Sequence, residues 1–191
     1  MNPCSPILIK PQRFTDERGW FMESWSEAIM LHHGIRVEFV QDNHSMSLRP
    51  GTIRGIHFQR PPHAQAKLVR CTSGAIVDYA VDLRRNSPTF GRWVSAELTA
   101  RNGLQLYVPV GFGHAFITLT EGAEVNYKVS EAYAPAYDDG IVWNDAMIGI
   151  DWPLPVSGAM LSDKDKSLPT LAEFDSPFEY DGHPLAALAL L

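Results

Sequence analysis

The sequence has little that would anchor it in a membrane or brace it with disulfide bonds. No apolar run approaches the roughly 20 residues that a membrane-spanning helix needs. The N-terminus lacks the basic segment followed by an apolar block that marks a secretory signal. The two cysteines of the chain, Cys4 and Cys71, provide neither a disulfide framework nor the spacing of a zinc site. We therefore expect a cytoplasmic protein that does not associate with membranes.

Basic residues are also in short supply. The chain of 191 residues has 16 lysines and arginines against 22 acidic residues, so its formal net charge is −6. An acidic surface repels a phosphate backbone, and nucleic acid is therefore not an expected partner. A small anionic ligand remains compatible with this charge, provided that basic side chains cluster locally.

Long helical periodicities are missing as well. The 14 glycines and 14 prolines fall between short apolar runs, which is typical of strands and turns. Residues 75–83 alternate, so Val77, Tyr79, Val81 and Leu83 are predicted to share one face of a strand. Further strands are predicted at residues 93–98, 104–108, 114–119 and 125–131.

Only short helical segments are expected around these strands. Residues 24–33 are predicted to form a helix that ends at Gly34, and residues 162–174 a loop with one helical turn over the barrel. The tail, residues 184–191, is expected to dock as a last strand or helical turn, or to fray. Evenly spaced strands without crossover helices predict an all-β fold, a jelly-roll or cupin-like β-barrel formed by residues 1–191 as a single domain.

The densest group of polar residues surrounds one histidine. His57 lies in an apolar strand pattern between Ile56 and Phe58, with Arg54 three residues before it and Lys67 ten after it. A lone histidine in such a pattern is more often a core residue than a catalyst. Basic side chains on neighbouring strands repel one another, however, unless an anion or a developing negative charge lies among them. The cluster therefore favours an anion-binding or catalytic site.

Metal binding is an alternative interpretation of the same region. Residues 51–57 and 109–114 partly match the two halves of the cupin metal motif, but Gln59 stands where a second histidine is usual. The remaining candidate ligands are His57, His63 and His114. Because the histidine pair is broken, the half-matches are better explained as barrel turns, and no metal is expected.

A series of short blocks follows a fixed order between about residue 10 and about residue 170. The blocks are 16–24 (DERGWFMES), 39–45 (FVQDNHS), 54–59 (RGIHFQ), 65–69 (QAKLV), 82–84 (DLR), 87–91 (SPTFG), 113–116 (GHAF), 127–128 (YK), 143–145 (WND) and 151–153 (DWP). Together they resemble the dTDP-4-dehydrorhamnose 3,5-epimerases. The resemblance implies a jelly-roll homodimer that inverts C3 and C5 of a nucleotide-linked 4-keto sugar and needs neither metal nor coenzyme.

The resemblance also implies roles for individual residues. His57 would remove the proton beside the ketone, and Asp165 would orient that histidine. Tyr127 would supply a proton to the opposite face, and Lys67 would stabilise the enolate oxygen. The predicted substrate-binding residues are Arg18, Phe21, Glu23, Gln41, Asn43, Arg54, His114, Tyr133, Trp143 and Lys164. Arg18 and Glu23 lie near the N-terminus, so the resemblance suggests that they reach the partner subunit's site.

Physical chemistry agrees with these roles, although the residues alone leave alternatives. Inversion needs a base on one face and an acid on the other, and a histidine has an unperturbed pKa of about 6.5. Tyr127 alternates with Val125 and Val129 and could be a core tyrosine. Without the alignment to the family, Asp163 is as plausible as Asp165 for the aspartate that orients His57.

The chain departs from the family pattern at a few positions, namely Gly113, Ala115, Asn126 and Asp138. These departures leave room for a relative that inverts only one carbon or takes a modified sugar. Two rivals from other classes are a metal-dependent cupin enzyme and a sugar-nucleotide binding module without activity. A pure binder has no need of an acid and a base on opposite faces, which favours the epimerase.

Overall fold

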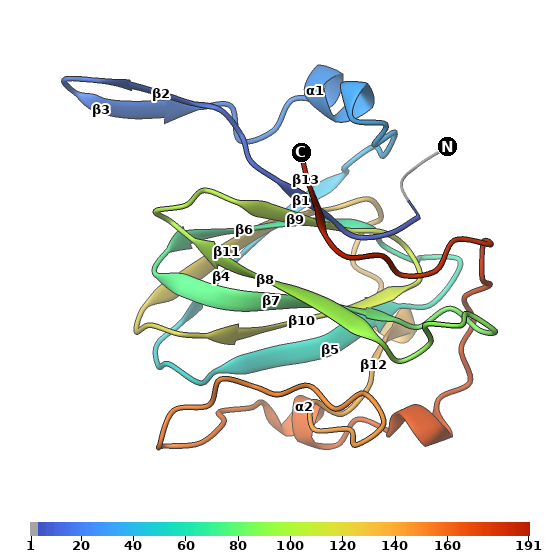
Figure 1. The fold of residues 1–191 in the computed structure, drawn as a ribbon. Helices are drawn as coiled ribbons and strands as arrows, with labels where there is room; N and C mark the ends of the chain where they lie inside the picture. Colours follow the sequence, from blue (N-terminus) through green and yellow to red (C-terminus); the bar gives the residue numbers. More distant parts are fainter. Residues whose placement is uncertain (1–3) are drawn as a thin grey trace.

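Two β-sheets pack face to face and form the body of the molecule (Figure 1). The structure is a computed structural model, and it describes residues 4–191. The six-stranded sheet has the order β13 (Ala189–Leu190), β1 (Ile7–Ile9), β9 (Gln105–Val108), β6 (Lys67–Ser73), β11 (Ala123–Val129) and β4 (Gln41–Ser47). The five-stranded sheet has the order β12 (Asp138–Gly140), β5 (Ile53–Gln59), β10 (Phe112–Thr118), β7 (Ala75–Asp82) and β8 (Trp93–Thr99). The predicted all-β jelly-roll class is confirmed.

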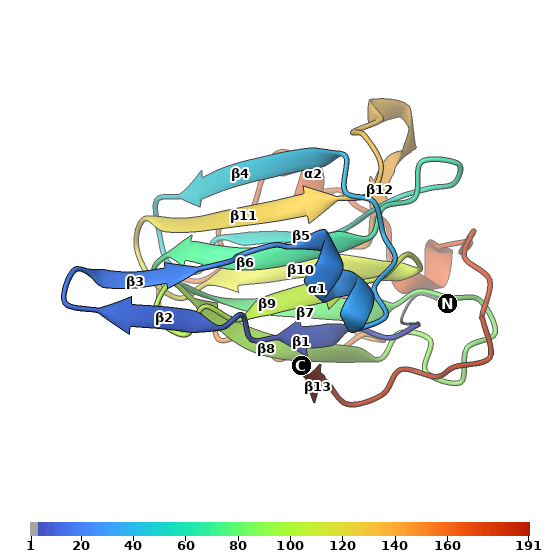
Figure 2. The ribbon, with the colours of Figure 1, turned by 90° about the horizontal axis from the view of Figure 1, so that it is seen from above.

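Smaller elements lie around the two sheets. A hairpin of β2 (Arg13–Asp16) and β3 (Gly19–Met22) and the helix α1 (Glu27–His32) lie over the six-stranded sheet (Figure 2). The helix is shorter than predicted and ends just before Gly34, whose φ of 80° stops it. The other side carries the helix α2 (Asp163–Lys166) and the short 3-10 helix η2 (Leu171–Glu173), while η1 (Pro135–Tyr137) precedes β12. No helix within the described chain is long and apolar enough to cross a membrane.

The alternation predicted for residues 75–83 is confirmed, but both faces of β7 are buried. Ile76 and Ala80 face the other sheet and join the core between the sheets. Tyr79 and Val81 point the opposite way, into a second apolar cluster with residues of the segment 141–178. That segment crosses beneath β5 in Figure 1 and covers the outer face of the five-stranded sheet. The predicted loop and helical turn over the barrel are therefore confirmed.

The C-terminal tail docks on the body as a strand, one of the alternatives predicted for it. Phe174 and Phe178 pack against Phe58 with ring centroids 5.1 and 5.6 Å away. The chain then returns to the six-stranded sheet, where β13 pairs in parallel with β1. The two ends of the described chain therefore meet at one edge of that sheet (Figure 1).

A buried arginine ties both ends of the chain to the end of β7. Arg84 is 2% exposed and donates to both carboxylate oxygens of Asp82, at 2.9 and 2.8 Å. Its third nitrogen donates to the Cys4 carbonyl at 3.0 Å and to Asp181 at 2.9 Å. The guanidinium lies over the Phe112 ring, 4.5 Å from its centroid. This arrangement satisfies a charge that would otherwise be costly to bury.

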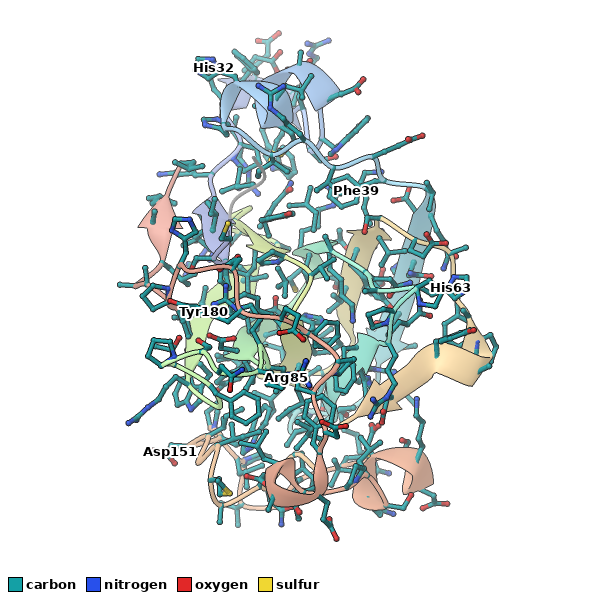
Figure 3. The ribbon with its side chains drawn as sticks, turned by 90° about the vertical axis from the view of Figure 1, so that its right-hand side faces the viewer. His32, Phe39, His63, Arg85, Asp151 and Tyr180 are labelled. Carbon is teal, nitrogen blue, oxygen red and sulfur yellow. The ribbon has the colours of Figure 1, made fainter. Side chains whose placement is uncertain are left out.

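Replacing this arginine should destabilise the whole fold. In Arg84→Met the Asp82 carboxylate stays buried without its counter-charge, so we expect the free energy of unfolding to fall by about 3–5 kcal/mol. Urea denaturation followed by circular dichroism measures this loss. Arg85→Met is the matched control, because Arg85 pairs with Glu179 at the surface (Figure 3) and should lose far less. Equal losses of unfolding free energy in the two variants would contradict the stabilising role of Arg84.

Candidate active site

A cavity of about 440 Å³ opens between the two sheets, and polar side chains from several strands converge on it. Its walls include Arg54, His57, Lys67, His114, Tyr127 and Asp165. A second cavity of about 220 Å³ adjoins it and shares His57, Lys67 and Tyr127. The walls of the second cavity also include Gln41, Asn43, Tyr133, Asp138 and Lys164. The fold therefore brings together all four predicted catalytic residues and most of the predicted binding residues.

Strand pairing places His57 at the centre of this group. On β5, His57 stands opposite His114 of β10 and opposite Gly140 of β12. A side chain at position 140 would begin 2.4 Å from the Ile56 carbonyl oxygen and 3.3 Å from the His57 ring. Glycine at this position therefore allows β12 to approach β5 closely enough to form a wall of the site.

A buried carboxylate orients His57. Asp165 Oδ1 lies 2.6 Å from His57 Nε2, and the Asp165 side chain is 6% exposed. Burial opposes ionisation of Asp165, but the hydrogen bond and charge of His57, with help from Ser162, hold the Asp165 pKa below its ordinary value. Because an ionised carboxylate only accepts hydrogen bonds, Nε2 carries a proton and the lone pair of neutral His57 is on Nδ1.

The structure also separates the two candidate aspartates of α2. The Ser162 hydroxyl caps the helix by accepting a hydrogen bond from the Asp165 backbone N–H at 3.1 Å, and the Asp165 side chain of this helix is buried. Asp163 is fully exposed and pairs with Lys166 instead. The cap is a local feature, whereas the burial of Asp165 and its contact with His57 depend on where the covering segment lies.

Tyr127 and Lys67 complete the wall beside His57. Burial raises the pKa of Tyr127 above its ordinary value, so the phenol keeps its proton at neutral pH. Burial lowers the pKa of Lys67 to about 8, although Asp138 and Asp78 oppose that change. Lys67 Nζ is 3.5 Å from the His57 carbonyl oxygen, which places a cation beside the base. The cavity thus offers a proton acceptor, a proton donor and a positive charge.

A second histidine–aspartate pair lies behind the cavity. His114 Nε2 is 2.7 Å from Asp78 Oδ1, and Asp78 is completely buried. Burial lowers the pKa of His114 and raises that of Asp78. The alternation predicted for residues 75–83 puts Asp78 on the face opposite Val77 and Tyr79 but predicts no role for it. The available signal was a charged residue at an inward position between Ile76 and Ala80.

Asp138 links the residues predicted to hold the nucleotide. Its Oδ2 accepts hydrogen bonds from the Tyr133 hydroxyl at 3.0 Å and from Lys164 Nζ at 2.5 Å. Gln41 donates to Asn43 at 2.8 Å and accepts from the Tyr133 backbone N–H at 3.1 Å. The Tyr133 ring itself is 56% exposed at the cavity mouth. An exposed aromatic face beside fixed polar groups suits stacking on a base.

Arg54 stands at the rim of the larger cavity. Its guanidinium donates to the Ser47 hydroxyl at 3.3 Å and to the Met46 carbonyl at 3.2 Å. These bonds to β4 aim the arginine at the cavity while leaving donors available. A planar fork of donors is suited to bidentate contact with a phosphate.

Four predicted binding residues are not part of these cavities. Arg18, Phe21 and Glu23 are exposed residues of the projecting hairpin and the segment that follows it. Trp143 is the fourth of these residues. It packs against Trp152, with ring centroids 6.3 Å apart, beside the apolar cluster outside the five-stranded sheet. Its contact with substrate stays a prediction.

The histidines considered as metal ligands are not gathered at one point. His63 lies at the periphery of the molecule (Figure 3), against the Tyr137 ring and 3.6 Å from Glu131. His57 and His114 each pair with a carboxylate instead. Among residues 4–191, no three His, Cys, Asp or Glu side chains gather as a ligand set.

The fold and this site define a cupin-like jelly-roll protein equipped for acid–base chemistry on an anionic ligand. Comparison with known proteins identifies the family. The family model of dTDP-4-dehydrorhamnose 3,5-epimerase matches residues 5–173, so the chain belongs to that family of isomerases.

Individual relatives agree with the family assignment. The dTDP-4-dehydrorhamnose 3,5-epimerase of Sinorhizobium fredii is 49% identical over 91% of this chain and 88% of its own length. A crystal structure of the Bacillus anthracis enzyme with TDP and PPi bound is 47% identical, covers 86% of this chain and 93% of that one, and has a TM-score of 0.84. The Legionella pneumophila dTDP-6-deoxy-D-glucose-3,5-epimerase in complex with dTDP-4-keto-L-rhamnose is 37% identical, covers 95% and 98%, and has a TM-score of 0.88.

The second histidine should be neutral in solution. Because burial lowers its pKa, we expect the His114 ring to be neutral at pH 7, with a single proton. Two-bond ¹H–¹⁵N spectra distinguish the two neutral tautomers from the imidazolium, and His114→Gln identifies the signals. Imidazolium shifts at pH 7 would contradict this arrangement.

Proposed function

We propose that the protein converts dTDP-4-keto-6-deoxy-D-glucose to dTDP-4-keto-L-rhamnose by inverting C3 and C5 of the sugar. The carrying observation is the His57–Asp165 pair at 2.6 Å, which faces one cavity together with Tyr127 and Lys67. The names of the relatives and the ligand of the Legionella structure support this choice of substrate. The product would serve deoxysugar and surface-polysaccharide synthesis.

The first step is removal of a proton from the carbon beside the ketone. His57 Nδ1 takes the proton, and the electrons of the broken C–H bond move into an enolate whose charge rests on the C4 oxygen. The Asp165 carboxylate stabilises the imidazolium that forms. Lys67 stabilises the enolate oxygen, and a preorganised donor of this kind is typically worth about 3 kcal/mol or more.

The second step returns a proton to the opposite face. Tyr127 donates its phenolic proton to the carbon as the enolate electrons form the new C–H bond, and the ketone is restored. Solvent then reprotonates the phenolate and removes the proton from His57. Two separate groups are needed because a single group would usually return the proton to the face it came from.

The nucleotide would lie along the second cavity and the adjoining rim of the larger one. Tyr133 offers a ring for the thymine, while Arg54 and Lys164 offer positive charge to the diphosphate. This small basic region in an acidic protein accounts for how a chain of net charge −6 holds an anionic substrate.

A homodimer would complete the site. The hairpin of β2 and β3 pairs with no other strand among the described residues, and Phe14 and Phe21 on it are 52% and 65% exposed. An isolated hairpin with exposed aromatic rings is marginal in water. We infer that it docks on a second copy of the chain, where Arg18, Phe21 and Glu23 reach the partner's substrate.

Deuterium exchange tests the reaction directly. Wild-type protein stripped of metal and incubated with dTDP-4-keto-6-deoxy-D-glucose in D₂O should introduce deuterium at C3 and C5, as seen by proton NMR. His57→Ala should lose exchange at both carbons and still bind dTDP, because its change leaves the nucleotide contacts intact. Tyr127→Phe should slow completed inversion more than it slows the initial proton removal.

The pattern of exchange separates the alternatives. Deuterium at a single carbon would identify an enzyme that inverts only that carbon. No exchange at either carbon would contradict the proposal, and restoration by added metal would then favour the metal-dependent cupin reaction. Tight dTDP binding without exchange under any condition would indicate a binding module.

The pH dependence should report Lys67. Its pKa of about 8 means that it is protonated below pH 8 and loses its positive charge as the pH rises through 8. We therefore expect kcat/KM to fall above pH 8, whereas an ordinary lysine would hold its charge to about 10.4. Lys67→Arg should not show this fall in kcat/KM above pH 8, whatever its maximal rate. A wild-type kcat/KM that stays level to pH 10, or the same fall above pH 8 in Lys67→Arg, would contradict the role of Lys67.

A further inference from the structure

The hairpin of β2 and β3 projects beyond the edge of both sheets (Figure 2), and one side chain anchors it to the body. Arg13 donates from Nη2 to the Ala100 carbonyl at 2.7 Å and from Nη1 to the Arg101 carbonyl. The same guanidinium lies over the Trp20 ring, 4.2 Å from its centroid. Arg13 therefore joins the base of the hairpin, its second strand and the turn between β8 and β9.

That turn is built to receive a guanidinium. Asn102 Oδ1 accepts hydrogen bonds from the backbone N–H groups of Thr99 and Leu104, both at 3.0 Å, and this fixes the path of the turn. Gly103 has a φ of +65°, and a Cβ at this position would lie 2.6 Å from Arg13 Nη2. The glycine thus leaves room for the arginine, while the fixed backbone presents two carbonyl oxygens to it.

The strand register decides what the two faces of the hairpin do. Arg13 stands opposite Met22, and Thr15 stands opposite Trp20, so Arg13 and Trp20 share a face. Phe14 and Phe21 oppose each other and lie on the other face. Arg13 holds one face of the hairpin on the β8–β9 turn, so the two phenylalanines lie on the side away from that turn. There Phe14 also lines a cavity with α1, and Phe21 is 65% exposed.

We propose that Arg13 is a positioning residue, which fixes the hairpin so that Phe21 and Glu23 enter the partner subunit's substrate cavity. This inference rests on the dimeric epimerase proposed above. Without the contacts of Arg13, the hairpin samples many orientations, and ordering it when substrate binds costs free energy. Loss of Arg13 therefore weakens substrate binding. It leaves proton transfer unchanged, because His57 and Tyr127 lie on other strands.

Homodimeric variants test the effect on binding. In Arg13→Ala, KM should rise by about tenfold, as expected for the loss of a charge-assisted hydrogen bond, and kcat should stay within about twofold. Arg13→Lys keeps the positive charge but not the planar set of donors, so its KM should lie between those of wild type and Arg13→Ala. Arg92→Ala, which removes an exposed arginine just before β8, at the end of that strand far from the β8–β9 turn, should match wild type. An unchanged KM in Arg13→Ala, or an equal fall of kcat, would overturn the proposal.

Mixed dimers test whether Arg13 acts across the interface. In the first, one chain carries His57→Ala and the other Arg13→Ala, so the intact site receives an intact hairpin and should show a normal KM. In the second, one chain carries both substitutions and the other is wild type, so the intact site receives the loosened hairpin and should show the raised KM. The reverse pattern would place the effect of Arg13 within its own chain and overturn the proposal, as would a protein that is monomeric in solution.

Calorimetric titration with dTDP keeps this inference distinct from the proposed reaction. If wild-type protein binds dTDP but turns over no keto sugar, the epimerase proposal fails. A dTDP affinity about tenfold weaker in the Arg13→Ala homodimer would even then support the positioning role. An unchanged dTDP affinity would overturn it.

Discussion

The apolar character of both faces of the five-stranded sheet is the constraint on which the rest of the structure depends. One face is covered by the six-stranded sheet, and the other needs a separate layer, which residues 141–178 supply. That layer carries α2, and so it brings Asp165 to within 2.6 Å of His57, 108 residues away in the sequence. Packing of residues 141–178 on the five-stranded sheet and assembly of the catalytic pair therefore occur together, and residues that pack in that layer, such as Trp152, position the site indirectly.

Several titratable side chains lie in the interior of the barrel, and most of them are paired. His57 faces Asp165, His114 faces Asp78, and Arg84 holds Asp82. Pairing offsets the large cost of taking charges out of water, and the same low dielectric makes each remaining interaction strong. Burial lowers the pKa of Lys67, and the charges of Asp138 and Asp78 offset this change only in part. A buried cation of this kind is suited to a negative charge that exists only during the reaction.

The hairpin shows the opposite situation, because its own chain leaves it largely uncovered. Its aromatic residues are exposed, and the cavity of the same chain contains none of Arg18, Phe21 and Glu23. A site completed by a second subunit explains both facts together. Anchoring by Arg13 then matters more than it would in a hairpin that is packed along its length.

Periodicity and turn residues alone were enough to predict the all-β class, the strands from residue 75 to residue 131 and the short helix before Gly34, because these patterns are local. The family resemblance supplied the candidate site residues, and most of them line two adjoining cavities. Local patterns could not distinguish Asp165 from Asp163, pair Asp78 with His114 or bring Phe174 and Phe178 onto Phe58. Each of those outcomes depends on contacts between strands and segments distant in sequence, and the chain makes such contacts only when its two sheets and their covering layer pack together.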